Sequence, residues 1–175
     1  MNAIFQPYQI DFYKRFWKLI YDQGKAAGIS PDLMISQMAL ESNWGRSDLA
    51  MIGKNYFGIK IHSWKGKTYG VYRAYNTATE SISNYIYFLK TNSRYLKIFT
   101  TQDKTFETQA ALIAAAGYAT DPNYLSKLTA INKNLQLIGE IYRNEQNTTP
   151  PRGNGGGVIF AALLLLAFTR IKTKK

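Results

Sequence analysis

The chain has 175 residues, which is enough for one folded domain and an appendage. It contains no cysteine and only one histidine, His62, which excludes disulfides, thiolate catalysis and a histidine-based zinc site, so we expect neither a metal nor a cofactor. The net charge of +11 suits a polyanionic partner, such as a bacterial cell wall, a membrane surface or a nucleic acid, and charge alone does not choose among them.

Two helices are predicted at the start of the chain. Apolar side chains recur at helical spacing over residues 8–27, and Gly28 is placed to end this helix. Charged residues interrupt residues 1–23, so this segment is not expected to be a signal peptide. Ser30 and Pro31 are typical of an N-cap and a first helical residue. The helix that follows is apolar on most sides, and we expect it to be central and buried and to stop near Gly45.

A small hairpin is predicted in the middle of the chain. Residues 46–57 indicate a loop with one helical turn. The β-like runs 57–62 and 68–73 flank residues 64–67, which favours a short hairpin turning there.

Three further helices are predicted after the hairpin. Thr77 and Glu80 match a capping box, and Asp121 and Pro122 are typical of a helix start. The expected ranges are about 78–91, 106–116 and 122–144. No internal repeat is present, so the sequence predicts a mostly helical domain with one minor hairpin.

Composition divides the chain after residue 145. Residues 1–145 form the expected folded domain, and the Pro/Gly-rich segment 146–157 is typical of a linker. Residues 158–169 carry no charge and predict a transmembrane anchor of marginal length, with a buried or interfacial helix as the alternative. The basic residues of the tail 170–175 fit the cytoplasmic side of such an anchor.

Glu41 is the residue best placed for acid chemistry. It lies near the end of the apolar second helix, where partial burial favours its neutral form and the negative end of the helix dipole acts in the same direction. Both effects raise the pKa of a carboxyl group, as a general acid at neutral pH requires. The structural alternative is an exposed or salt-bridged helix residue.

Four ordered segments across residues 12–142 carry a family resemblance. They are Ala39–Ser47, Asn55–Lys60, Tyr72–Tyr85 and Ala116–Leu128. Together they resemble glycoside hydrolase family 73, the bacterial endo-β-N-acetylglucosaminidases that include flagellar wall-cutting enzymes and autolysins. The resemblance implies an α+β, mainly α, lysozyme-like fold with a small β-lobe beside a cleft, to which this chain adds a C-terminal hydrophobic helix. The implied partner is the glycan strand of peptidoglycan, with no nucleic acid expected.

The resemblance also assigns site residues. It makes Glu41 the catalytic acid and Tyr118 and Asp121 further catalytic candidates. The candidates for substrate binding are Trp44, Asn55, Phe57 and Tyr124. Structural alternatives remain open: Asp121 as the cap of the last helix, Asn55 as a turn residue and the aromatic residues as core.

The hairpin is shorter than the family pattern, and residues 59–79 contain no Asp or Glu. The second carboxylate expected of ordinary glycosidases is therefore not visible there. Three mechanisms remain: attack by the acetamido group of the substrate, which we favour, a water held by Asp121 or Tyr118, or a transglycosylase reaction.

The sequence favours an N-acetylglucosaminidase over three alternatives. These are a lytic transglycosylase or muramidase of the same fold, a non-catalytic wall-binding protein, and a nucleic-acid binder suggested by charge alone. The expected setting is a membrane-anchored enzyme facing the cell wall, and a bacteriophage whose particle contains or crosses a membrane is one such setting.

Overall fold

The computed structural model describes residues 5–148. The chain divides between Arg143 and Asn144 into two units, and the elements below belong to the first unit, apart from the last residues of α7. Within the described range, no helix has both the length and the hydrophobicity needed to cross a membrane. The predicted anchor 158–169, the tail 170–175 and all but the first residues of the linker 146–157 lie outside the described residues.

The first two helices begin as the sequence predicts. Helix α1 (Pro7–Ala27) ends at Gly28, whose φ of 77° lets its N–H bond back to the carbonyls of the last turn. Helix α2 (Pro31–Glu41) is capped by the Ser30 hydroxyl, which accepts from the N–H of Leu33. Of the nine residues from Pro31 to Ala39 in α2, all except Asp32 are buried, which confirms the prediction of a central, buried helix.

Helix α2 ends at Glu41, four residues before the predicted stop at Gly45. Asn43 and Trp44 adopt left-handed backbone conformations, with φ of 50° and 58°, and Gly45 follows with φ of 76°. The Ser42 hydroxyl fixes this turn, because it donates to the Met38 carbonyl at 2.5 Å and accepts from the N–H of Gly45 at 2.8 Å. Glu41 is therefore the last helical residue and stands at the negative end of the helix.

The hairpin is smaller than predicted and turns at a different place. After the single turn of α3 (Asp48–Met51), strands β1 (Thr68–Tyr69) and β2 (Tyr72–Arg73) pair antiparallel around Gly70. The prediction of a turn at residues 64–67 was wrong, because Gly70, with φ of 56°, allows a two-residue turn inside the predicted second strand. Of the predicted first strand, 57–62, only Lys60 forms a bridge, to Tyr72.

The second half of the domain is helical. It comprises α4 (Ala78–Thr91), a 3-10 turn η1 (Ser93–Tyr95), α5 (Leu96–Thr100), α6 (Phe106–Ala115) and α7 (Tyr124–Thr148). The sequence did not predict η1 and α5, which are too short to show a helical period. Helix α7 begins two residues later than predicted and continues beyond residue 144 into the segment predicted as a linker.

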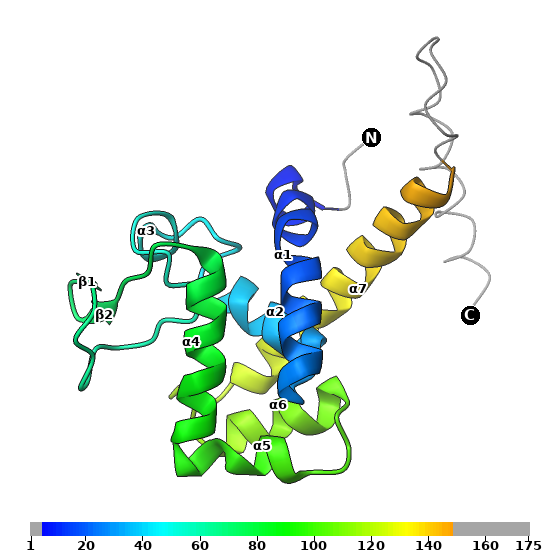
Figure 1. Cartoon of the computed structure of the whole chain (residues 1–175). Helices are drawn as coiled ribbons and strands as arrows, with labels where there is room; N and C mark the ends of the chain where they lie inside the picture. The colour runs from blue at the N-terminus through cyan, green and yellow to red at the C-terminus, as the bar shows by residue number, and fades with distance from the viewer. Residues whose placement is uncertain (1–4, 149–175) are drawn as a thin grey trace. The chain divides into compact units, whose positions relative to one another are not determined.

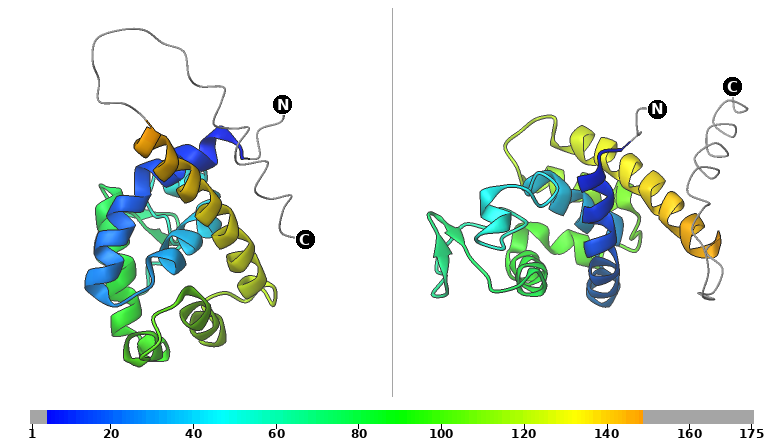
Figure 2. Two further views of the ribbon diagram at one scale, coloured as in Figure 1. Left: turned by 90° about the vertical axis from the view of Figure 1, so that its right-hand side faces the viewer. Right: turned by 90° about the horizontal axis from the view of Figure 1, so that it is seen from above.

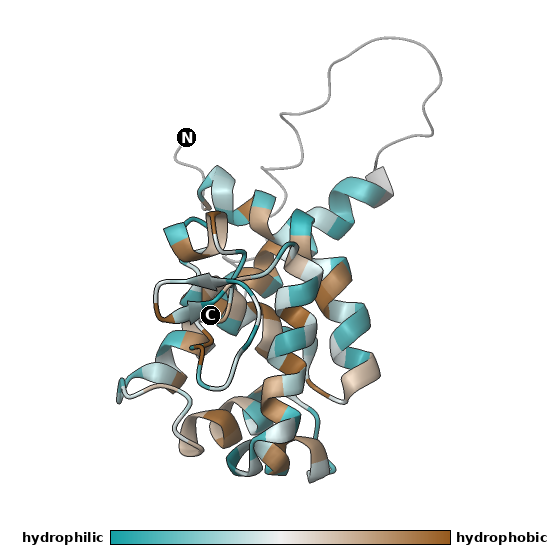
Figure 3. Cartoon of the chain, turned by 60° about the vertical axis from the view of Figure 1, so that its left-hand side comes forward, coloured by the Kyte–Doolittle hydropathy of each residue, from teal (hydrophilic) through white to brown (hydrophobic). Residues whose placement is uncertain are grey.

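The helices pack around α2. Contacts join α1 to both α2 and α4, and join α2 to α6. Figures 1 and 2 show the β1–β2 hairpin standing to one side of the helices, beyond α4. Figure 3 shows hydrophilic and hydrophobic residues mixed along the outer helices, as expected where one helix face meets a core and the other meets water.

Candidate active site

Glu41 closes α2 as a half-buried carboxyl group. Burial raises the pKa of Glu41 above its ordinary value, while a hydrogen bond from the Tyr124 hydroxyl, at 3.1 Å from Oε1, acts to lower it. The net direction of the pKa is upward because desolvation is the larger effect. This is the direction that the sequence predicts for a proton donor.

A buried chain of hydrogen bonds supports Glu41. Gln37 lies one helical turn earlier, is 0% exposed, and its Nε2 donates to the Tyr124 hydroxyl at 2.8 Å. The Tyr85 hydroxyl donates to Oε1 of Gln37, which fixes the orientation of the amide. Burial raises the pKa of Tyr124 and of Tyr85 well above the usual value, so both hydroxyls keep their protons.

The direction of this chain determines where the acidic proton sits. Tyr124 accepts from Gln37, so its one proton is directed at Oε1 of Glu41. When Glu41 is neutral, its own proton therefore belongs on Oε2.

Gly58 leaves space beside that oxygen. Its φ of 66° is a left-handed conformation, and a Cβ placed on it would lie 3.7 Å from Oε2 of Glu41. Apart from the neighbouring residues 57 and 59, no other described heavy atom lies within 4 Å of that position. The absence of a side chain at position 58 thus leaves space on the side of Glu41 where Oε2 lies.

Asn55 and Phe57 hold the Gly58 loop in place. Asn55 accepts from the N–H groups of Phe57 and Ile59 and donates to the carbonyls of Ile59 and Arg73, both at 2.9 Å. The ring of Phe57 stacks on Tyr85 with centroids 4.0 Å apart. Both residues are only 1% exposed, so their side chains shape the loop and do not face a ligand.

The other aromatic candidates take different places. Trp44 packs edge-on against Phe12 at 5.6 Å and is half-buried. The Tyr118 hydroxyl donates to the Phe57 carbonyl at 3.0 Å, and its ring stacks on Tyr124 at 6.0 Å. Tyr118 thus anchors the Gly58 loop, whereas Tyr124 is the tyrosine that bonds to Glu41.

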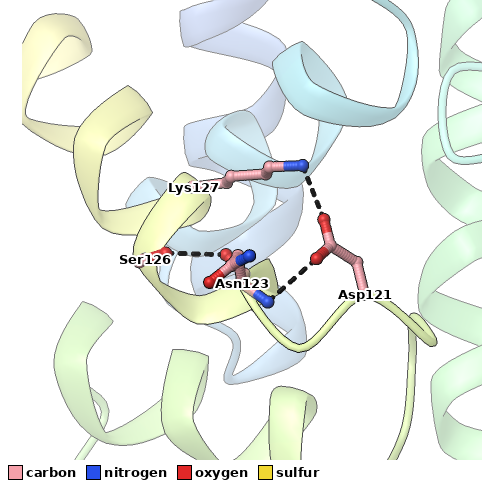
Figure 4. A network of polar contacts seen from close by, with 4 residues as sticks. All are labelled: Asp121, Asn123, Ser126 and Lys127. Atoms are coloured by element: carbon pink, nitrogen blue, oxygen red, sulfur yellow. Dashed lines mark hydrogen bonds and ion pairs between the residues drawn. The ribbon is translucent and has the colours of Figure 1, made fainter.

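Asp121 bonds to two neighbouring residues just before the start of α7, as Figure 4 shows. Its carboxylate accepts from the N–H of Asn123 at 2.9 Å and pairs with Lys127 at 2.6 Å. The hydrogen bond from Lys127 holds the pKa of Asp121 below its usual value. Asp121 therefore has a structural role, but the prediction that it directly caps the helix was wrong, because Pro122 and Asn123 lie between it and Tyr124, the first residue of α7.

All eleven acidic residues of the sequence lie within residues 5–148. In that range, no other carboxylate hydrogen-bonds to Glu41, Tyr124, Gln37 or Tyr85. Asp22, Glu80 and Asp103 are bonded elsewhere, to Lys18, Asn76 and Thr108 respectively. Nor does the described range contain a group of three or more residues suited to hold a metal ion.

Gln37, Tyr85 and Gly58 were not predicted as site residues. The sequence does hold a signal for Gln37, a polar residue in an apolar helix placed four positions before Glu41, and therefore on the same face. Tyr85 and Gly58 carry no such signal, because their roles depend on contacts between distant segments.

Comparisons with known proteins show a family and several relatives. The family model described as mannosyl-glycoprotein endo-beta-N-acetylglucosaminidase matches residues 17–137. Peptidoglycan hydrolase FlgJ of Salmonella typhimurium is 36% identical over 135 residues, covering 65% of this chain and 42% of that protein. Exo-glucosaminidase LytG of Bacillus subtilis is 30% identical over 127 residues, covering 62% of this chain and 45% of that protein. The chain thus spans less than half the length of these relatives.

The fold matches as well. The glycoside hydrolase domain of Salmonella typhimurium FlgJ superposes with a TM-score of 0.68 at 31% identity, covering 79% of this chain and 95% of that structure. The catalytic domain of the Listeria monocytogenes autolysin Auto gives a TM-score of 0.64 at 27% identity, covering 79% and 90%. With its lysozyme-like helical fold and a family match over most of its length, the chain belongs to the glucosaminidase family.

Proposed function

We propose that this protein hydrolyses the β-1,4 glycosidic bonds of peptidoglycan glycan strands as an N-acetylglucosaminidase, with Glu41 as its general acid. The observation that carries the proposal is the raised pKa of Glu41, combined with the open position beside its Oε2. The family match and the relatives named peptidoglycan hydrolase and exo-glucosaminidase support it.

In the first step, Oε2 of Glu41 gives its proton to the glycosidic oxygen as the bond from that oxygen to the sugar C1 breaks. Tyr124 stabilises the carboxylate that forms, because its hydroxyl already donates to Oε1. Gly58 provides the space in which the glycosidic oxygen approaches.

The second group in the reaction is proposed to come from the substrate. The acetamido oxygen of the sugar attacks C1 from the opposite face and forms a five-membered ring, which takes the place of a carboxylate nucleophile. Water then opens this ring at C1 and returns a proton to Glu41. Among the described residues, no other carboxylate acts on the pKa of Glu41, as one at the roughly 5 Å of a retaining pair would, and this favours the route.

Substitution of the acid tests the proposal. Glu41→Gln keeps the side-chain shape but has no acidic proton, so we expect the rate of wall digestion to fall by about 10²–10⁴-fold. Asp121→Asn is the matched control and should keep most activity, because Asp121 bonds to Lys127 and not to Glu41. Full activity of Glu41→Gln, measured as release of soluble glycan fragments, would remove Glu41 from the mechanism.

A substrate without acetamido groups tests the second step. De-N-acetylated glycan strands should be cleaved at least about 10²-fold more slowly, since the internal nucleophile is lost. Equal rates on both substrates would show that water attacks directly. Products with a 1,6-anhydro end, one water lighter, would instead identify a lytic transglycosylase.

We also propose that the protein acts from a membrane, held by residues 158–169, and that a phage particle is its setting. The uncharged stretch followed by basic residues supports the anchor, and anchoring would keep the enzyme near its polymeric substrate. Flotation of the full chain with lipid vesicles and its presence in purified virions are the respective tests. Failure to float, or absence from virions, rejects the corresponding part.

A further inference from the structure

A cavity of about 830 Å³ lies between the hairpin side of the domain and α4. Its walls include Trp64, Lys67 and Tyr75 from the hairpin region and Ser83, Asn84 and Tyr87 from α4. Glu41 and its hydrogen-bond partners do not line it. The volume falls in the range of about 300–1,000 Å³ that is typical of small-ligand sites.

One wall of the cavity presents a fixed hydrogen-bond donor. Oδ1 of Asn84 accepts from the Arg73 guanidinium and from the Tyr75 hydroxyl, both at 2.8 Å. Burial raises the pKa of Tyr75 to about 12, so this hydroxyl keeps its proton. With its oxygen occupied twice, the Asn84 amide cannot turn over, and its Nδ2 has no acceptor among the described residues.

The same cavity has a free aromatic surface. Tyr87 is 62% exposed and makes no ring or cation contact with another described residue. The opposite wall is held firmly, since the Trp64 ring packs on Gly66 and its indole N–H donates to the Lys67 carbonyl at 2.8 Å. The Nδ2 donor of Asn84 and the exposed ring of Tyr87 together fit an N-acetylated sugar. The apolar face of such a sugar packs on an aromatic side chain, and its acetamido oxygen accepts a hydrogen bond.

The cavity is connected to the catalytic loop by hydrogen bonds. Arg73 holds Asn84, the Arg73 carbonyl accepts from Asn55, and Asn55 fixes the residues on both sides of Gly58. The two sites therefore belong to one continuous set of contacts. A polymer-cutting enzyme gains catalytic power when remote sugars are bound as well as those at the broken bond.

We propose that this cavity is an accessory subsite that binds an N-acetylated sugar of the glycan strand, away from the bond cut at Glu41. The sugar ring packs on Tyr87, and its acetamido oxygen accepts from Nδ2 of Asn84. This inference rests on the proposed function for its substrate, but it concerns binding and not the chemical step.

Calorimetric titration of the full-length Glu41→Gln protein, which leaves the ligand uncut, tests the subsite. The probes are the hexamer and the dimer of β-1,4-linked N-acetylglucosamine. Tyr87→Ala should weaken hexamer binding by about 5- to 10-fold, the effect of losing one aromatic contact. Dimer binding should not change, because the proposed function places the dimer at Glu41, which does not line this cavity.

Two further variants complete the test. Tyr87→Phe keeps the ring and should bind the hexamer like the parent, while Tyr21→Ala removes an exposed tyrosine of α1 that does not line this cavity and should change neither affinity. Unchanged hexamer binding in Tyr87→Ala, or equal weakening for hexamer and dimer, overturns the subsite. A failure of the proposed function appears separately, as wall digestion that survives Glu41→Gln.

Discussion

At the scale of the residue, the burial of Glu41 favours its role as an acid but lowers the stability of the fold. A carboxyl group whose pKa is raised by burial costs stability once it ionises, since the unfolded chain holds the charge in water. This cost is fully present above the raised pKa and disappears as the pH falls below the ordinary carboxyl pKa. A proton donor of this kind is therefore expected to make the folded protein less stable at neutral pH.

Glu41→Gln should consequently stabilise the protein at pH 7, by about 0.5–2 kcal/mol, as substitutions at strained functional sites often do. The gain should shrink as the pH is lowered through the interval between the raised and the ordinary carboxyl pKa. Thermal unfolding of wild type and variant across pH 3 to 8 checks this. A variant that is less stable than wild type at neutral pH would mean that the carboxylate is stabilised in the fold.

Burial raises the pKa of Glu41, and one hydrogen bond from Tyr124 opposes this larger effect. In Tyr124→Phe this bond is lost, so the pKa of Glu41 should rise further. The basic limb of the pH profile of kcat/KM should then move to higher pH, with a lower maximum because the position of the proton is no longer fixed. Tyr118→Phe is the control, since its hydroxyl bonds to the Phe57 carbonyl, and its basic limb should stay in place. A basic limb that does not move in Tyr124→Phe argues against the hydrogen-bond direction described here.

At the scale of the element, the end of α2 and the Gly58 loop together form the site. The sequence predicts α2, its cap and its burial because these depend on local signals: Ser30, Pro31 and a run of apolar residues. It does not predict where α2 ends, because the turn of three successive left-handed residues, including Asn43 and Trp44, depends on the hydrogen bonds of the Ser42 hydroxyl, which the apolar pattern does not reveal. The hairpin turn was misplaced because that segment contains both Gly66 and Gly70, and the sequence pattern does not show which of them forms the turn.

Gly58 provides the test at this scale. Gly58→Ala should cost about 1 kcal/mol from the left-handed backbone alone and should also fill the space beside Oε2 of Glu41. We therefore expect a loss of kcat/KM well beyond the loss of stability. Gly28→Ala carries a similar backbone strain, with φ of 77° and nothing within 4 Å, and should lower the melting temperature with little effect on kcat/KM. Equal catalytic losses in the two variants would assign the role of Gly58 to stability alone.

At the scale of the whole molecule, composition separates a folded domain from the segment that follows it. The core of residues 5–143 is built from α1, α2, α4 and their neighbours, and the family match ends at residue 137, inside this unit. The predicted family and the predicted lysozyme-like helical fold are confirmed. They could be predicted because four motifs in a fixed order are a strong signal even when single positions are ambiguous. The roles of individual site residues stay predictions, because they depend on which side chains the fold brings together.

Removal of residues 153–175 tests this division. The shortened protein should be soluble without detergent, keep the melting temperature of the full chain and lose its association with lipid vesicles. Its activity on soluble glycan strands should be unchanged. Aggregation or a lower melting temperature would show that the apolar stretch is part of the core and does not act as an anchor.

The most direct measurement for the central claim is mass spectrometry of the fragments released from purified peptidoglycan by wild type and by Glu41→Gln. The account predicts fragments from wild type that end in a reducing N-acetylglucosamine and carry one added water per cut, and almost none from the variant. Fragments ending in a 1,6-anhydro sugar, or equal amounts from both proteins, would contradict it.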